Sequence, residues 1–315
     1  HPLPPPAHPR EGVDPQGLGA RLGAERPGRR RPSRREAGVQ AKVAPEAATE
    51  AAMEVIEANG VALHVRVEGP SEGPVLAFSN SLGTDLRSWD ALVPLLPPGL
   101  RLLRYDMRGH GLSDCPDGPW TIEDHADDLA GLLDAIGAPR AVICGLSVGG
   151  LIGQALAHRR PYLVAGLVLC DTGAKIGTEA MWSDRIHRIE SGGIAAIADG
   201  VLERWFTARF RERDPGFPLW RNMLLRTPVE GYLRTAAAIR AADYRERARR
   251  LRLPALAICG AEDGATPPEL VRATAHLIEG CRYEEIPEAG HLPCIEQPAA
   301  LASLLTAFLR ETGHA

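Results

Sequence analysis

The 315-residue sequence has few aromatic residues, no long apolar run and no regular spacing of cysteine or histidine. No stretch approaches 18 consecutive apolar residues, so the sequence predicts no transmembrane helix and no membrane partner. The six cysteines form no C-x-x-C pair, and no secretion-signal pattern is present, so we expect reduced thiols in the cytoplasm. No two histidines stand at ligand spacing, and we therefore expect no metal site.

Charge also excludes some functions. The formal net charge of −4 argues against nucleic acid as a main partner. Residues 1–52 differ from the rest, because they hold nine of the 27 prolines, nine Lys or Arg against six Asp or Glu, and no aromatic residue. Such a segment cannot bury enough apolar surface to offset the entropy of ordering it, so we predict a disordered N-terminal extension.

The arginine-rich stretch at residues 26–35 suggests two other roles, and neither fits. A twin-arginine export signal needs an apolar stretch after the arginines, which residues 37–42 do not provide. A nucleic-acid-binding arm needs more charge and some aromatic residues. Because Met53 lies just before the first expected strand, we interpret residues 1–52 as an extension upstream of the domain.

From residue 53 onward, short apolar runs alternate with helical patterns. Asn59-Gly60 between two strand-like runs is typical of a type I′ hairpin, and Thr121 with Asp124 is typical of a helix N-terminus. Alternating strands and helices predict an α/β fold with a mostly parallel, doubly wound sheet. Residues 174–250 break the alternation, read as helical and hold eight of the 15 aromatic residues, most of which we expect in packing. We therefore predict a core of residues 53–173 and 251–315, with a helical cap inserted at 174–250.

The most informative motif is Gly-Leu-Ser-Val-Gly at residues 145–149, which follows an apolar strand-like run and precedes a helical pattern. A G-x-S-x-G at a strand-to-helix joint is the nucleophile elbow of the α/β-hydrolases. The turn forces the serine into a sparsely populated backbone conformation, and its neighbours must be small. Ser147 is therefore the predicted nucleophile.

A serine nucleophile needs a base and a group that orients the base. His291 is the predicted base, because it follows the last expected strand behind a glycine. His110 is the competitor, but its loop precedes the nucleophile and reads better as a structural turn. Asp263 is the preferred acid, since Ser147, Asp263, His291 is the hydrolase chain order. Asp171, which ends the strand after the elbow, remains the alternative.

The oxyanion that forms during acyl transfer needs two backbone donors. One should be the amide of Val148, directly after the nucleophile. The other should come from the loop at residues 79–84, where we predict the amide of Leu82.

Several longer runs make the sequence familiar: Phe-Ser-Asn-Ser-Leu-Gly-Thr-Asp-Leu-Arg at 78–87, Arg-Tyr-Asp-Met-Arg-Gly-His-Gly at 104–111, Asp-Thr-Gly-Ala-Lys-Ile-Gly-Thr at 171–178, Met-Trp at 181–182 and Ala-Thr-Pro-Pro at 265–268. Over roughly residues 54–310 the chain resembles the 3-oxoadipate enol-lactonases of aromatic catabolism, members of the α/β-hydrolase superfamily. The resemblance departs at Val148, where methionine is frequent, and at Gly264, where proline is frequent. It implies a cofactor-free serine hydrolase that opens a five-membered enol-lactone carrying a carboxymethyl group.

A substrate of this kind is a small anion, so a cationic side chain should meet it under the cap. Arg185, one helical turn from Trp182, is the first candidate, and Lys175 is the second. We expect Trp182 to share the same ligand. Two other functions remain open on this fold: a carboxylesterase or cofactor-free perhydrolase, which would share every catalytic residue, and a ligand receptor without turnover.

Overall fold

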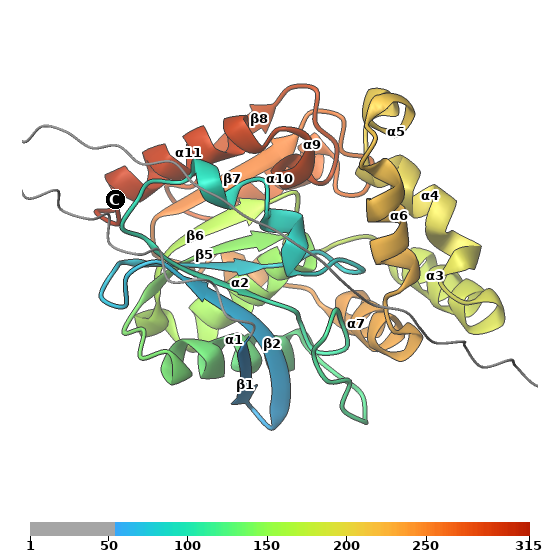
Figure 1. Cartoon of the computed structure of the whole chain (residues 1–315), viewed down its shortest axis with the longest axis horizontal. Coiled ribbons are helices and arrows are strands. Elements are labelled where there is room, and N and C mark those ends of the chain that lie inside the picture. The colour runs from blue at the N-terminus through green and yellow to red at the C-terminus, as the bar shows by residue number, and fades with distance from the viewer. Residues whose placement is uncertain (1–53) are drawn as a thin grey trace, which may run out of the picture. The chain divides into compact units, whose positions relative to one another are not determined.

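The computed structural model describes residues 54–315, and the predictions for residues 1–52 lie outside this range. Within it, the strands form one eight-stranded sheet of order β1-β2-β4-β3-β5-β6-β7-β8 (Figure 1). β2 runs antiparallel to β1 and β4, and every other neighbouring pair is parallel, which confirms the predicted mostly parallel sheet. The strands are β1 Glu54–Ala58, β2 Val61–Glu68, β3 Val75–Ser79, β4 Arg101–Tyr105, β5 Ala141–Leu146, β6 Val164–Cys170, β7 Ala255–Gly260 and β8 Arg282–Ile286.

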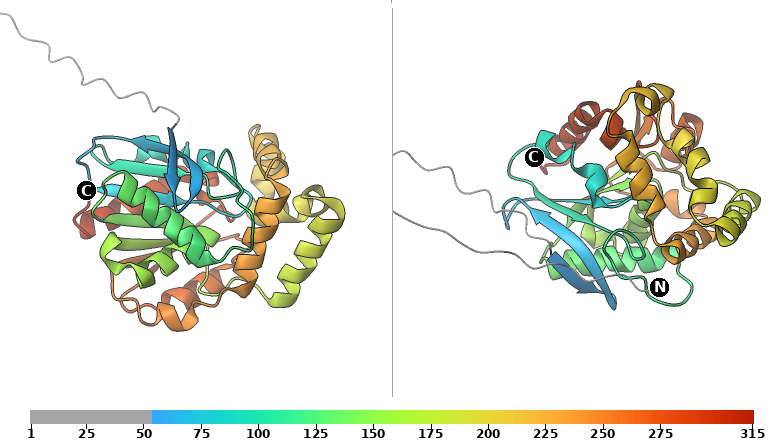
Figure 2. Two further views of the ribbon diagram at one scale, coloured as in Figure 1. Left: turned by 90° about the horizontal axis from the view of Figure 1, so that it is seen from below. Right: turned by 45° about the vertical axis from the view of Figure 1, so that its right-hand side comes forward.

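The central strands are apolar because helices cover both faces of the sheet. Every residue of β3, β5, β6 and β7 is buried. Seen from below, α1 lies in front of the sheet, and α11 lies behind it (Figure 2, left). The helices of this core are α1 Ile122–Ala135, α2 Val148–Arg159, α9 Pro268–Ala275, α10 Pro293–Glu296 and α11 Pro298–Glu311, with short 3₁₀ turns η1 Leu86–Trp89, η2 Val93–Leu95 and η3 Pro161–Leu163.

Two local predictions are confirmed in detail. Asn59 and Gly60 both have positive φ, at 51° and 72°, as a type I′ turn requires. Thr121 and Asp124 form a reciprocal capping box at the start of α1.

The chain between β6 and β7 is helical, and we call it the helical insertion. It lies to the right of the sheet in Figure 1. Phe206 contacts Trp205, Phe210 and Phe217, so several of its aromatic rings serve packing, as predicted. None of the helices in residues 54–315 has the length and apolarity needed to cross a bilayer. The helices of the insertion are α3 Glu179–Gly192, α4 Ala195–Trp205, α5 Ala208–Arg213, α6 Phe217–Leu225, α7 Val229–Ala241 and α8 Arg245–Ala248.

Candidate active site

Ser147 stands at the sharp joint between β5 and α2. Its backbone has φ 57° and ψ −118°, a conformation that L-residues rarely adopt. A Cβ at Gly145 would lie 2.2 Å from the Gly149 oxygen, and a Cβ at Gly149 would lie 2.1 Å from the Ser79 oxygen. Both flanking positions therefore admit glycine alone, as the motif predicts.

Hydrogen bonds from the neighbouring strand hold this joint in place. The Ser147 amide donates to the Cys170 oxygen at 2.9 Å, and Thr172 Oγ1 donates to the Ser147 oxygen at 2.5 Å. The end of β6 thus fixes the backbone on which the Ser147 hydroxyl is mounted.

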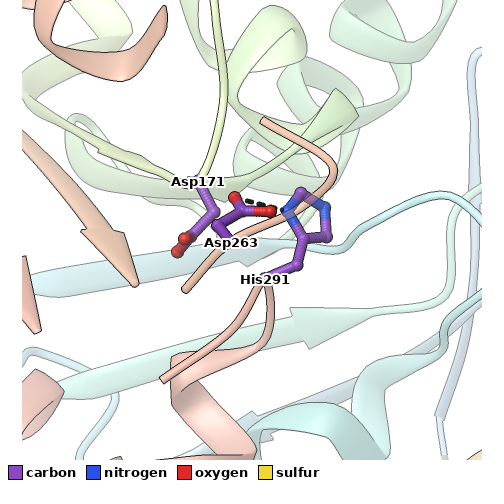
Figure 3. A group of neighbouring side chains, drawn as sticks. All are labelled: Asp171, Asp263 and His291. Carbon is purple, nitrogen blue, oxygen red and sulfur yellow. Dashed lines mark hydrogen bonds and ion pairs between the residues drawn. The ribbon is translucent and has the colours of Figure 1, made fainter. Parts of the chain in front are cut away.

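His291 and Asp263 meet where the loops after β8 and β7 come together (Figure 3). His291 Nδ1 lies 2.9 Å from Asp263 Oδ2, and both side chains are almost fully buried. Thr266 supports the pair, since its hydroxyl donates to Asp263 Oδ2 at 2.7 Å and lies 3.2 Å from His291 Nδ1. Burial opposes charge on Asp263, but the nearby His291 and the hydrogen bonds it receives outweigh burial and lower its pKa. Asp263 is thus set up as a carboxylate that orients the imidazole.

Asp171 lies beside this pair without contacting the histidine ring. Its Oδ1 accepts a hydrogen bond from the Gly260 amide at 2.7 Å, and its Oδ2 is buried with no partner among residues 54–315. Burial, and then the charge of Asp263, raise the pKa of Asp171 well above its usual value. Acidic and imidazole atoms of Asp171, Asp263 and His291 lie within 4.8 Å of one another, and the burial that raises the pKa of Asp171 opposes the charged form that a metal ligand needs.

Helix α4 holds the loops that carry the acid and the base. The Arg204 oxygen accepts from the Gly264 amide at 3.2 Å, and the Trp205 oxygen accepts from the His291 amide at 2.8 Å. A proline at position 264 could not donate the first of these bonds. Glycine at position 264, where proline is frequent in the family that the sequence resembles, therefore allows a hydrogen bond that links the helical insertion to the core.

Ser147 and His291 line one cavity of about 220 Å³. In the described structure of residues 54–315, Ser147 Oγ forms no hydrogen bond with the imidazole of His291. His291 Nε2 instead lies 3.5 Å from Ser81 Oγ, at the outer limit of a hydrogen bond. Contacts between a nucleophile and its base are often long until substrate binds. The two groups therefore share a reaction space.

The loop at residues 79–84 borders the same cavity through Ser81 and Leu82. It is held rigidly, because Asn80 donates to the Tyr105 oxygen at 2.8 Å and accepts from Trp89 Nε1 at 2.7 Å. The Leu82 amide has no hydrogen-bond partner in residues 54–315. The Val148 amide stands in the first turn of α2, where no intrahelical acceptor exists. Both amides are available to an oxyanion.

The helical insertion contributes a cationic wall to the cavity. The Arg185 guanidinium lies over the Trp182 ring, 4.6 Å from its centroid, so these two predicted residues are brought together. Arg204, which sequence reasoning missed, lines the cavity as well. Burial, and then the neighbouring Arg185 charge, lower the pKa of Arg204. Within residues 54–315, neither arginine has a carboxylate partner.

Two other candidates are placed elsewhere. Lys175 does not line the cavity, and its Nζ lies 3.4 Å from Asp243 Oδ2, so the geometry does not support it as a substrate ligand. His110 is fully buried, with Nδ1 3.2 Å from the Arg108 oxygen, in the structural turn that was expected. Ser81 and Thr266 belong to the motifs at 78–87 and 265–268, but the sequence alone does not predict that they contact His291.

Comparison with known proteins agrees with this geometry. The model of the alpha/beta hydrolase family matches residues 76–304. The chain belongs to the α/β-hydrolase family. It is 34% identical over 260 residues to 3-oxoadipate enol-lactonase 2 of Acinetobacter baylyi, which covers 82% of this chain and 96% of that protein. Identity to 3-oxoadipate enol-lactonase 1 of the same organism is 31%, over 81% of this chain and 96% of the relative.

Solved structures show the same relationship. The chain superposes on the enol-lactonase from Burkholderia xenovorans LB400 with a TM-score of 0.79 and 42% identity, covering 82% of this chain and all of the other. A thermophilic esterase from Thermogutta terrifontis matches with a TM-score of 0.77 and 30% identity, over 84% of this chain and all of the esterase. The predicted α/β-hydrolase fold is thereby confirmed, and enol-lactonases and an esterase share it.

Proposed function

We propose that this hydrolase opens the lactone ring of 3-oxoadipate enol-lactone to give 3-oxoadipate. The relatives named as 3-oxoadipate enol-lactonases support the proposal, at 31–34% identity over most of both chains. The cavity of about 220 Å³ is small, which suits a compact lactone better than a long-chain ester.

The observation that carries the proposal is the cationic wall next to the nucleophile. Arg185 and Arg204 line the same cavity as Ser147 and His291. Two guanidinium groups under the insertion are unfavourable to each other unless an anion joins them. The carboxymethyl group of the enol-lactone is such an anion, and an uncharged ester has no group to fill that role.

The chemistry then follows from the positions of the side chains. Ser147 Oγ attacks the lactone carbonyl carbon while His291 Nε2 takes the hydroxyl proton, with Asp263 stabilising the imidazolium. The amides of Leu82 and Val148 donate to the oxyanion. Collapse breaks the ring C–O bond, and the expelled enolate oxygen takes the proton from His291. The enol then tautomerises to a ketone.

The second half of the reaction releases the acid. Water attacks the acyl group on Ser147 while His291 Nε2 removes its proton, and that proton returns to Ser147 Oγ as the ester bond breaks. Arg185 and Arg204 hold the substrate carboxylate through both steps. No cofactor is needed at any point of this sequence.

One assay tests the proposal directly. Loss of enol-lactone absorbance on addition of protein should follow saturation kinetics, with kcat/KM far above that for p-nitrophenyl acetate. A substrate panel that includes simple carboxylic esters and a peracid-forming reaction distinguishes an enol-lactonase from a carboxylesterase and from a cofactor-free perhydrolase. Turnover of uncharged esters that exceeds turnover of the lactone would refute the assignment, and binding without turnover would indicate a receptor.

A further inference from the structure

A second cavity, of about 420 Å³, shares no lining residue with the first. It lies between β2, the loops that follow β3 and β4, and the end of α6. This volume falls within the range of about 300–1,000 Å³ typical of small-molecule sites. The proposed function does not use it.

Two residues that line this cavity each have a buried nitrogen atom with no hydrogen-bond partner in residues 54–315: His64 at Nε2 and Arg66 at Nε. His64 is 8% exposed, and its ring is fixed from the other side, where Nδ1 lies 2.8 Å from Asp106 Oδ2. A buried polar group without a partner costs about 1–3 kcal/mol. Two such groups on alternate positions of β2 indicate a partner that residues 54–315 do not supply.

The acidic residues of the cavity are already engaged. Asp85 forms a two-pronged pair with Arg87, at 2.9 and 2.6 Å. Asp106 accepts from the Leu86 amide at 2.8 Å and the Leu112 amide at 2.9 Å, in addition to facing His64. The oxygens of both carboxylates are thus already occupied by donors from this chain.

Two arginines of the cavity consequently have no carboxylate partner in the part of the chain that is described: Arg66 on β2 and Arg226 at the end of α6. The residue opposite Arg66 on β4 is Arg104, whose guanidinium is held by Glu68 and Asp90 at 2.5 Å each. The cavity thus presents a surplus of positive charge and one unpartnered N–H donor, Arg66 Nε.

Apolar side chains also line the cavity and indicate what kind of anion fits. Leu86 and Met223 are buried lining residues. A bare inorganic ion would leave this hydrocarbon surface unused, whereas an organic acid covers it. Guanidinium groups recognise carboxylates through paired N–H donors.

We propose that the second cavity is a binding site for a small organic carboxylate, held by the guanidinium groups of Arg66 and Arg226 in the cavity that His64 also lines. The site is separate from the reaction space, and the proposal does not depend on the enol-lactonase activity.

Calorimetric titration of the full chain with sodium succinate, at constant ionic strength, tests the site. Because succinate also fits the first cavity, the titration is made on the Arg185→Gln/Arg204→Gln variant. One succinate should bind per chain, and adding Arg66→Gln should weaken binding at least about tenfold, the loss of a charge-assisted contact. Arg221→Gln is the matched control, since Arg221 is an exposed arginine of α6 that pairs with Asp199.

Loss of all binding in the Arg185→Gln/Arg204→Gln variant, or unchanged affinity after Arg66→Gln, would overturn the proposal. Phosphate that competes more strongly than succinate would overturn the organic part of it. A measurement on the wild-type chain avoids the risk that a variant misfolds. The ¹⁵N resonance of His64 Nε2 should shift when succinate is added. No shift at saturating succinate would leave the cavity without a carboxylate ligand and refute the site.

Discussion

Asp171 and Asp263 present two carboxyl groups to one buried region, and of these two carboxyls in residues 54–315 it is Asp263 that hydrogen bonds to the imidazole of His291. Two neighbouring buried carboxyls do not both ionise readily. The surroundings of the two carboxyls show which one ionises more readily. Asp263 faces His291 and the Thr266 hydroxyl, whereas Asp171 Oδ2 has no donor partner in residues 54–315. The pKa of Asp263 is lowered and the pKa of Asp171 is raised, so Asp263 ionises more readily than Asp171.

The opposite pKa shifts of Asp171 and Asp263 predict that replacing each aspartate by the isosteric asparagine has a different effect on catalysis. Asp263→Asn should lower kcat about 10⁴-fold, because the imidazole loses its orienting carboxylate. Asp171→Asn should keep kcat within about tenfold, since an amide replaces a neutral acid of the same shape. Steady-state kinetics on the enol-lactone measures both. A larger loss for Asp171→Asn would mean that Asp171 is the acting acid.

The same pair predicts a pH effect on stability. Because the pKa of Asp171 is raised on folding, the folded chain holds this proton to a higher pH than the unfolded chain, which releases it above pH about 4. Wild-type stability from this group is therefore full at low pH and is lost as pH rises. Asp171→Asn should gain free energy of unfolding relative to wild type between pH 4.5 and pH 8, measured by urea denaturation. A difference that does not change with pH would contradict the protonated state.

Replacing the nucleophile should abolish activity without unfolding the chain. Ser147→Ala should lower kcat by about 10⁴- to 10⁶-fold, as for other members of a catalytic triad. Ser303→Ala, on the exposed face of α11, is the control and should leave kcat unchanged. The wild-type, Ser147→Ala and Ser303→Ala proteins should give the same circular dichroism spectrum. If Ser147→Ala keeps a kcat within tenfold of wild type, Ser147 is not the nucleophile.

The cationic wall should determine substrate preference. Arg185→Gln or Arg204→Gln should lower kcat/KM for the carboxylated lactone by about 30- to 1,000-fold, equal to roughly 2–4 kcal/mol. Hydrolysis of p-nitrophenyl acetate should be spared. Lys175→Ala is the matched control, because Lys175 pairs with Asp243 away from the cavity. Equal losses on both substrates would indicate a disturbed insertion rather than a carboxylate site.

Composition predicts that residues 1–52 are dispensable. They contain no aromatic residue, so little buried surface should depend on them. A chain that begins at Met53 should keep the Tm and kcat of the full chain. A fall in Tm of several degrees would show that the extension packs on the domain.

The sequence predicted the parts of the site that depend on local chain geometry. The elbow around Ser147, the Asn59-Gly60 turn and the alternation of strands and helices are encoded in neighbouring residues, and the structure has all of them. The choice between Asp263 and Asp171 could not be made locally, because it depends on where two loops meet. Arg204 was not distinguishable among the many arginines of the insertion, since the packing of α3 against α4 places it beside Arg185.

The backbone of Ser147 also limits how stable the active protein can be. At φ 57° and ψ −118°, glycine is the residue that fits without strain, and the conformation costs any other residue about 1–3 kcal/mol. Ser147→Gly would release that energy and remove the nucleophile in the same step. Selection for thermal resistance alone would therefore favour loss of catalysis at this position, so engineering for stability must seek its gains away from the elbow and keep the strained serine.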